Sequence, residues 1–196
     1  MKKIKNLKCY EGMLIVVDMV NGFVRKGVLH DEKIAEVVPR QLEIIKKAKT
    51  KGDLIVFIKD THDKNSTEHK RFGEHHCDRG SGEEELIDEF KMMENDENTI
   101  SIEKNSTSFM EAPDFRGVVL EATNIKKVEV VGCCTDICDF NGAMGLANYY
   151  DQWNRDVAIE VHTDAVATFA EETRKNYVDA AYLLMEQQGI ILVKKR

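Results

Sequence analysis

The chain has no surplus of basic residues and no long apolar segment, and each absence excludes a class of protein. Its 35 acidic residues outnumber its 28 lysines and arginines, which gives a formal net charge of −7. Binding to a nucleic-acid backbone requires clustered Lys and Arg, so we expect no nucleic-acid partner. The apolar run MLIVVDMV near the start is only about as long as a strand and contains an acid. We therefore expect neither a signal peptide nor a membrane span, and we expect a cytoplasmic protein.

The cysteines lack the spacing of a disulfide framework or of a structural zinc site. Five cysteines are an odd number, and disulfides are rare in the reducing cytoplasm. The sequence contains no CxxC pair, which disfavours both a structural zinc site and a thiol redox centre. Three of the five cysteines lie together in the segment GCCTDIC. A single cysteine is most often a small buried hydrophobic residue, so a chemical role for any of them needs independent support.

Apolar, β-branched runs alternate with segments of helical period along the chain, a pattern typical of a parallel α/β sheet. We predict a single domain over residues 1–196, with a doubly wound, six-stranded, mainly parallel sheet and helices on both faces. The expected strands are Met13–Met19, Leu54–Lys59, Thr99–Glu103, Lys127–Val131, Val157–Val161 and Ile190–Val193. The expected helices are Asp31–Lys51, Glu83–Met93, Asp114–Asn124, Thr135–Trp153 and Glu171–Gln188, and a structural loop is expected at His162–Asp164.

Chemically active side chains follow each of the first four expected strands. Sheets of this class bind ligands beyond the carboxyl ends of the strands, where the strand order reverses. Taken alone, each side chain has an ordinary explanation, such as a cap, a surface amine or a buried thiol. Their shared position in the topology predicts that they meet in one crevice. They are Asp18, Asp60 with His62, Lys104, and the segment Gly132–Cys138.

Three of these residues have the chemistry of an activated nucleophile. Cys138 lies near the first turn of an expected helix, where the helix N-terminus and the ammonium of Lys104 can lower the pKa of the thiol. Asp18 can accept the thiol proton and return it to a leaving amine. Backbone N–H groups around Cys134 and Cys138 can hold the oxyanion of a tetrahedral intermediate. Taken singly, the ordinary alternatives stay favoured: a buried structural thiol for Cys138, a helix or loop cap for Asp18 and a solvated surface amine for Lys104.

The polar stretch after the second expected strand favours a metal site. Four of the six histidines lie between Thr61 and Gly82. Asp60 and His62 are two positions apart, so an extended backbone directs both side chains to the same face. Carboxylate and imidazole together suit Zn, Mn or Fe(II). The alternative is a hydrophilic surface loop, in which histidine is ordinary.

Three segments resemble the signature segments of the isochorismatase-like cysteine hydrolases, a superfamily that includes the nicotinamidases (pyrazinamidases). The resemblance extends from about Gly12 to the C-terminus and implies the fold of that superfamily. The segments are DMVNGF (Asp18–Phe23), KNSTSF (Lys104–Phe109) and VVGCCTDIC (Val130–Cys138).

The resemblance implies roles for particular residues. Asp18, Lys104 and Cys138 would form a catalytic triad. The peptide bond between Cys133 and Cys134 would be cis, at the loop that carries the nucleophile. The chain departs from the pattern just after Cys138, because Asp139 stands where family members typically have an apolar residue.

The segment IKDTHDKNSTEHKRFGEHHC resembles the metal loop of nicotinamidases, in which D-x-H is followed by H-C-x-x-G-[ST]. The resemblance implies one divalent ion, with zinc favoured and Mn or Fe as alternatives. The implied ligands are Asp60, His62 and His76. A fourth position varies between His and Glu, and Glu68 fits it by its distance to Phe72, with His69 as the alternative. The spacing from Phe72 leaves His75 as an alternative to His76.

The implied reaction is the hydrolysis of nicotinamide to nicotinate and ammonia through a cysteine thioester, with the metal ion orienting the pyridine ring. Phe23 resembles the aromatic residue that stacks on the substrate ring, and Phe72 is a candidate for a second wall; each can equally be a core residue. Related folds commonly form homo-oligomers, so we expect one here. Two alternatives stay open: a related hydrolase acting on another small amide, an N-carbamoyl compound or a vinyl ether, and a non-catalytic binding relative.

Overall fold

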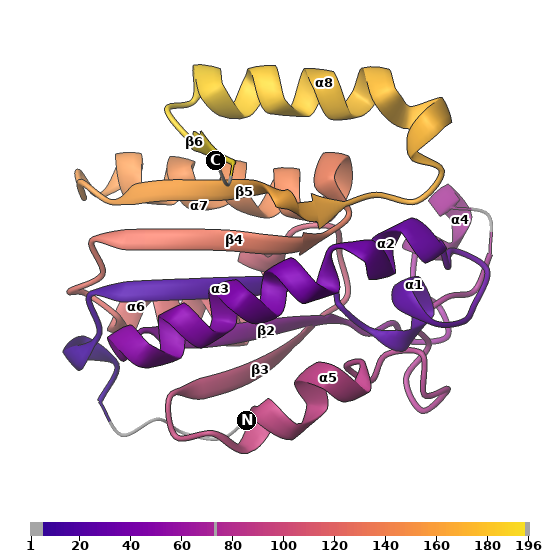
Figure 1. Cartoon of the computed structure of the whole chain (residues 1–196), viewed down its shortest axis with the longest axis horizontal. Helices are drawn as coiled ribbons and strands as arrows, with labels where there is room; N and C mark the ends of the chain where they lie inside the picture. Colours follow the sequence, from indigo (N-terminus) through magenta and orange to yellow (C-terminus); the bar gives the residue numbers. More distant parts are fainter. Residues whose placement is uncertain (1–5, 73, 195–196) are drawn as a thin grey trace.

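The computed structural model describes residues 6–72 and 74–194, and its centre is a six-stranded sheet (Figure 1). The strand order is β3-β2-β1-β4-β5-β6, and every neighbouring pair is parallel. The predicted α/β class with a doubly wound sheet is confirmed. The strands are β1 (Gly12–Val17), β2 (Leu54–Asp60), β3 (Thr99–Lys104), β4 (Lys127–Cys133), β5 (Ala158–Ala167) and β6 (Ile191–Val193).

Helices cover both faces of the sheet. Figure 1 shows α3 in front of the strands and α6 and α7 behind them, and α8 packs against α7. Within the described ranges, no helix is long and apolar enough to cross a membrane. The α-helices are α1 (Asn21–Val24), α2 (Glu32–Glu36), α3 (Val38–Lys51), α4 (Glu68–Phe72), α5 (Asp88–Lys91), α6 (Pro113–Glu121), α7 (Phe140–Gln152) and α8 (Glu171–Gln187). The shorter turns are the 3-10 helices η1 (Leu7–Cys9), η2 (Met92–Asn95) and η3 (Phe109–Glu111), and the π-helical turn η4 (Thr135–Asp139).

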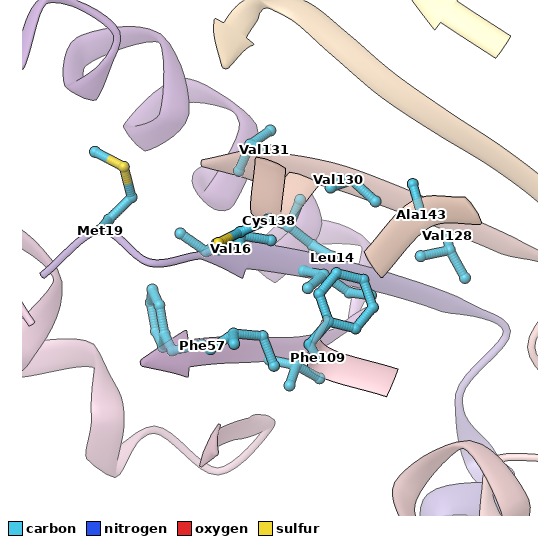
Figure 2. Packing of buried hydrophobic residues seen from close by; sticks show 14 of the residues in the cluster. Leu14, Val16, Met19, Phe57, Phe109, Val128, Val130, Val131, Cys138 and Ala143 are labelled. Atoms are coloured by element: carbon cyan, nitrogen blue, oxygen red, sulfur yellow. The ribbon is translucent and has the colours of Figure 1, made fainter. Parts of the chain in front are cut away.

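The central strands form because they are apolar on both faces. All residues of β1 from Met13 to Val17 are buried, as are Leu54–Ile58 in β2. Near-continuous runs of Val, Ile and Leu are typical of parallel strands that helices cover on both sides. Figure 2 shows part of this core, with Phe57, Phe109 and Cys138 among its labelled members. The nucleophile candidate therefore lies at the edge of a closely packed interior.

The sheet reverses its winding direction between β1 and β4, and a glycine lets these two strands approach each other. Gly132 has a φ of +144°, and a Cβ at this position would lie 2.2 Å from the carbonyl oxygen of Val17. Only glycine tolerates both the backbone conformation and the close contact. In open α/β sheets, ligands bind at this kind of reversal, beyond the carboxyl ends of the strands. The structure thus has the reversal of strand order at which the sequence pattern predicted the crevice.

The predicted helix Asp31–Lys51 is wrong as a single element, because it is interrupted at Val37 between α2 and α3. Pro39 lies in the first turn of α3. In a continuous helix its ring would clash with the carbonyl four residues earlier, whereas the first turn of a helix accommodates proline without loss of a hydrogen bond.

The predicted helix Glu83–Met93 is also wrong in extent, because α5 begins only at Asp88 and is followed by η2. The carboxylate of Glu83 accepts a hydrogen bond from the backbone N–H of Cys77, and that of Glu84 accepts from Gly80. These acidic residues therefore stabilise the preceding loop. The predicted helix Thr135–Trp153 begins as the π-helical turn η4 before α7 continues it.

The loop predicted at His162–Asp164 is wrong, since β5 continues to Ala167. The register between β4 and β5 shifts between Val130 and Gly132, which pair with Val161 and Val166. A bulge of this kind accommodates polar residues within a strand. His162 is buried, and its Nε2 lies 2.8 Å from a carboxylate oxygen of Glu129 on β4.

Candidate active site and metal centre

Asp18, Lys104 and Cys138 meet beyond the carboxyl ends of β1, β3 and β4. Lys104, the last residue of β3, places its Nζ 2.9 Å from Oδ2 of Asp18 and 3.6 Å from Sγ of Cys138. The same Nζ lies 2.6 Å from Oδ1 of Asp60 at the end of β2. Asp18 has a φ of 52°, a left-handed conformation that is uncommon outside glycine. All four side chains are buried.

Burial and the Lys104 ammonium set the proton affinities of the acidic groups. Burial raises the pKa of Asp18 to about 7, although Lys104 acts in the opposite direction. Burial acts to raise the pKa of Asp60 as well, but Lys104 and His62 more than offset it and lower that pKa to about 2. A carboxyl group that titrates near neutral pH suits proton transfer in both directions.

The Lys104 amine and the Cys138 thiol respond to the same surroundings in different ways. Burial disfavours the ammonium, but Asp18, Asp60 and Cys138 outweigh it and hold the pKa of Lys104 well above its ordinary value. The prediction that the helix N-terminus and Lys104 lower the pKa of the Cys138 thiol is wrong, because burial raises this pKa well above its ordinary value and outweighs the nearby ammonium. The resting state therefore has a charged lysine and a protonated thiol. A base must take the thiol proton before the sulfur can attack.

Cys138 is carried by the turn η4, which begins directly after a cis peptide bond between Cys133 and Cys134. The carbonyl of Cys134 accepts hydrogen bonds from the backbone N–H groups of Ile137 (3.0 Å) and Asp139 (3.1 Å). Asp136 anchors the turn, because its carboxylate accepts from the Thr168 hydroxyl (2.7 Å) and from Nε of Arg174 (2.9 Å). The nucleophile candidate thus lies on a turn tied to both β4 and α8.

Asp139, the departure from the family pattern, is completely buried. Burial raises its pKa well above the ordinary value. Among the described residues, neither of its carboxyl oxygens has a hydrogen-bond partner. Burial without a partner favours the neutral form of a carboxyl group, which is compatible with the apolar residue that the resemblance leads us to expect at this position.

Four potential metal ligands form a buried cluster beside the Lys104 amine. Ligand atoms of Asp60, His62, Glu68 and His76 all lie within 4.8 Å of one another. Nε2 of His62 is 3.0 Å from Asp60 and 3.5 Å from Glu68, and Nε2 of His76 is 3.8 Å from Asp60. The two alternatives from the sequence, His69 and His75, lie outside this cluster.

The donor set fits a divalent cation. Within the described part of the chain, Nε2 of His62 and Oε1 of Glu68 are buried without a hydrogen-bond partner, and buried polar atoms normally have one. Nδ1 of His62 lies 2.8 Å from Oδ1 of Asn105, and Nδ1 of His76 lies 3.0 Å from the carbonyl of Glu74. Such contacts fix the proton on Nδ1 and leave Nε2 free to ligate a metal ion. Two imidazoles and two carboxylates suit zinc and similar ions.

A narrow pocket joins Cys138 to the candidate metal ligands. The ring of His76 lies 6.2 Å from that of Phe23 and 5.9 Å from that of Phe72. Both aromatic side chains therefore line the pocket beside the metal cluster. The lining includes Cys138, Asp60, His76, Phe23 and Phe72.

Some residues of the site were not found from the sequence. Asn105, the contact of His62, directly follows Lys104 in the motif KNSTSF, and that adjacency was the available signal. Thr107 of the same motif lines the pocket, as do Ile137 and Phe169. Phe169 was missed because β5 extends further than predicted and places this ring at the carboxyl end of the sheet.

The chain is similar to amidases of known sequence and structure. It is 30% identical to Nicotinamidase 1 of Arabidopsis thaliana over 141 residues, which is 65% of this chain and 57% of that longer relative. The pyrazinamidase of Pyrococcus horikoshii in complex with zinc has a TM-score of 0.75 and 26% identity, covering 94% of this chain and 99% of that one. The N-carbamoylsarcosine amidase of Thermoplasma acidophilum has a TM-score of 0.71 and 26% identity, covering 94% and 96%.

The family assignment rests on almost the whole chain. Residues 12–194 match the isochorismatase domain. This range begins with β1 and ends after β6, so it contains the complete sheet and all the residues of the site described above. The chain belongs to the isochorismatase family of hydrolases.

Proposed function

We propose that the protein is a nicotinamidase, which hydrolyses nicotinamide to nicotinate and ammonia in the salvage of pyridine nucleotides. The observation that carries the proposal is the pocket that Cys138 shares with Asp60 and His76. A thiol and a metal-type cluster facing the same small space suit a substrate that combines a carboxamide with a metal-binding ring nitrogen. The similarity to a nicotinamidase and to a pyrazinamidase supports the same substrate class.

In the first half of the proposed reaction, Asp18 takes the proton from the Cys138 thiol. The thiolate sulfur attacks the carboxamide carbon and forms a tetrahedral intermediate. Backbone N–H groups around Cys134 and Cys138 hold the oxyanion. The carbon–nitrogen bond then breaks, Asp18 returns its proton to the leaving nitrogen, and ammonia departs from a thioester on Cys138.

In the second half, a water molecule attacks the thioester carbon. Asp18 accepts one proton from this water, and the carbon–sulfur bond breaks to release the carboxylic acid, which loses its remaining proton to the solvent and becomes nicotinate. Asp18 then returns the proton to the sulfur, which restores the resting state. Throughout both halves, Lys104 remains charged and lies 2.9 Å from Asp18 and 3.6 Å from the sulfur, so it stabilises negative charge on either group.

Asp60, His62, Glu68 and His76 would hold one divalent ion, with zinc favoured over Mn and Fe. When bound, this ion supplies a Lewis-acid position for the pyridine nitrogen. Phe23 and Phe72 would flank the ring and orient it, since aromatic faces pack well against a flat heterocycle. We further propose a cytoplasmic homo-oligomer; its size can be measured by light scattering.

The test is an ammonia-release assay with nicotinamide, run with and without a chelator. Cys138→Ala should abolish turnover and leave the far-UV circular dichroism unchanged. Cys9→Ala is the matched control, because Cys9 is exposed and outside the site, and it should retain wild-type activity. Ammonia release by Cys138→Ala at the wild-type rate would refute the assignment of the nucleophile.

An amidase for N-carbamoyl substrates is the second candidate, favoured by the similarity to N-carbamoylsarcosine amidase. A panel of N-carbamoyl amino acids in the same assay separates the two. Faster turnover of a panel member than of nicotinamide would replace the proposed substrate. Binding without turnover of any amide would favour the non-catalytic alternative.

A further inference from the structure

The side chains that the sequence left as alternative ligands form a second cluster of their own. Ligand atoms of His69, His75 and Asp78 all lie within 4.8 Å of one another. Nε2 of His69 is 3.1 Å from Oδ1 of Asp78, and Nδ1 of His75 forms a hydrogen bond of 2.9 Å with Oδ2 of the same carboxylate. The rings of His69 and His75 are 4.1 Å apart. We call these three residues the outer cluster. They are distinct from the inner cluster, which is the buried set of Asp60, His62, Glu68 and His76.

Residues that are adjacent in the sequence belong to different clusters. Glu68 and His69 are adjacent on α4, where successive side chains point about 100° apart, so one belongs to the inner cluster and the other to the outer cluster. His75 and His76 divide in the same way. Two backbone hydrogen bonds fix the loop against the end of β2, one from N–H of His62 to the Cys77 carbonyl and one from N–H of Arg79 to the His62 carbonyl, both 2.9 Å long.

We propose that His69, His75 and Asp78 bind a second divalent cation of the zinc type. Two imidazoles and one carboxylate are three ligands, which leaves further positions for water or an exchangeable ligand. His75 is exposed and Asp78 is half-buried, so an ion can enter from the solvent.

The spacing of the donor atoms supports a shared ion. Nε2 of His69 and Oδ1 of Asp78 are buried and 3.1 Å apart, yet among the described residues neither has a hydrogen-bond partner. Two ligand atoms on one tetrahedral zinc, each about 2 Å from the metal, lie roughly 3.3 Å apart. The two atoms therefore have the separation of neighbouring ligands without the alignment of a hydrogen bond. The inner cluster has the same feature, since Nε2 of His62 is 3.0 Å from Asp60 without a hydrogen bond.

The charges of the two clusters are compatible with simultaneous binding. The three carboxylates of Asp18, Asp60 and Glu68 offset the charges of Lys104 and of a dication in the inner cluster, so the inner site repels a second ion only weakly. The outer cluster offers one carboxylate and lies near solvent, which screens its charge. We therefore expect the outer ion to bind less tightly than the inner one.

The experiment is a titration of the metal-free protein with Zn²⁺, measured by calorimetry and by elemental analysis after equilibrium dialysis. His75→Gln should reduce the number of bound zinc ions by one, or weaken the affinity of one ion by about ten-fold or more. Asp78→Asn should have the same effect. His30→Gln is the matched control, because His30 belongs to neither cluster, and it should bind zinc as the wild type does.

The readout is the difference between variant and wild type, so it does not depend on the proposed amidase activity. Asp60→Asn should remove the inner ion and leave the outer one, which distinguishes the two sites. The proposal is overturned if His75→Gln and Asp78→Asn bind as many zinc ions as the wild type with unchanged affinities.

Discussion

At the scale of single residues, the site depends on the Lys104 amine, which pairs with two buried carboxylates. Lys104 contacts Asp18 on the side of the thiol and Asp60 on the side of the metal cluster. Both carboxylates are buried, and a buried charge is tolerated only when it is paired. Lys104 thus stabilises the folded chain as well as the charges of the proposed reaction.

Lys104→Met should therefore destabilise the protein by about 3–5 kcal/mol, because two buried carboxyl groups lose their partner. Urea denaturation followed by circular dichroism measures the effect. Lys33→Met is the control: Lys33 pairs with Glu172 at the surface, and exposed pairs contribute little to stability. Equal stability of the Lys104 and Lys33 variants would contradict this account of Lys104.

The sequence indicated most of the side chains that the structure brings together, because their types and their positions at strand ends carry the information. It could not decide between Glu68 and His69 or between His75 and His76. Spacing along a loop does not determine which of two adjacent side chains turns inward. The path of the chain determines it: α4 is helical, and Cys77, with a φ of 47°, redirects the backbone after His76.

At the scale of elements, the contact between β1 and β4 positions the turn that carries Cys138. Gly132→Ala should cost about 3 kcal/mol or more, because its Cβ would meet the Val17 carbonyl in a backbone conformation that alanine resists. Chemical denaturation tests this. Gly117→Ala in α6 is the control: among the described residues, no atom beyond the adjoining helix backbone lies within 4 Å of its added Cβ, and alanine within a helix is favoured over glycine by about 0.5–1 kcal/mol. Wild-type stability of Gly132→Ala would show that β1 and β4 can move apart without destabilising the fold.

The pair formed by β4 and β5 predicts a dependence of stability on pH. The hydrogen bond from His162 is the main cause that lowers the pKa of Glu129 to about 2, with Lys127 contributing further. Since this value lies below the ordinary pKa of about 4.5 for glutamate, the carboxylate stabilises the fold above pH 4.5. Solvent screens part of this interaction, so the contribution is about 1–2 kcal/mol, and it is lost as the pH falls towards 2.

Glu129→Gln removes this titration. Its free energy of unfolding should be lower than that of the wild type at pH 6, and the difference should shrink as the solution is acidified. Thermal unfolding at a series of pH values measures the difference directly. A difference that stays constant from pH 6 to pH 3 would show that Glu129 acts by packing and not by charge.

The limits of strands and helices were predicted well where the apolar pattern was continuous, and poorly where polar residues interrupt it. The end of β5 was missed because His162, Thr163 and Asp164 look like a loop, although a bulge lets the strand continue through them. The break at Val37 was missed because the apolar stripe continues across it. In that segment Pro39 decides the geometry and hydrophobicity does not.

At the scale of the whole molecule, an ion in the inner cluster should raise the resistance to unfolding. A ligand that binds only the folded state at about 100 times its Kd adds about 2.7 kcal/mol. For a chain of this size, that corresponds to an increase of roughly 5–10 °C in Tm. Differential scanning fluorimetry with Zn²⁺ measures the change, and Glu68→Gln should reduce it. An unchanged Tm at saturating zinc would argue against the buried metal site.

The parallel order of the strands also affects how quickly the site forms during folding. Cys133 donates from its sulfur to the carbonyl of Asp18, 115 positions away, and β1 pairs with β4 across a similar separation. Contacts between such distant segments form slowly, since a long loop must close before they contribute. During synthesis, Asp18 leaves the ribosome well before Cys138 has been synthesised. Recovery of enzymatic turnover after dilution from denaturant should therefore lag behind recovery of helical signal.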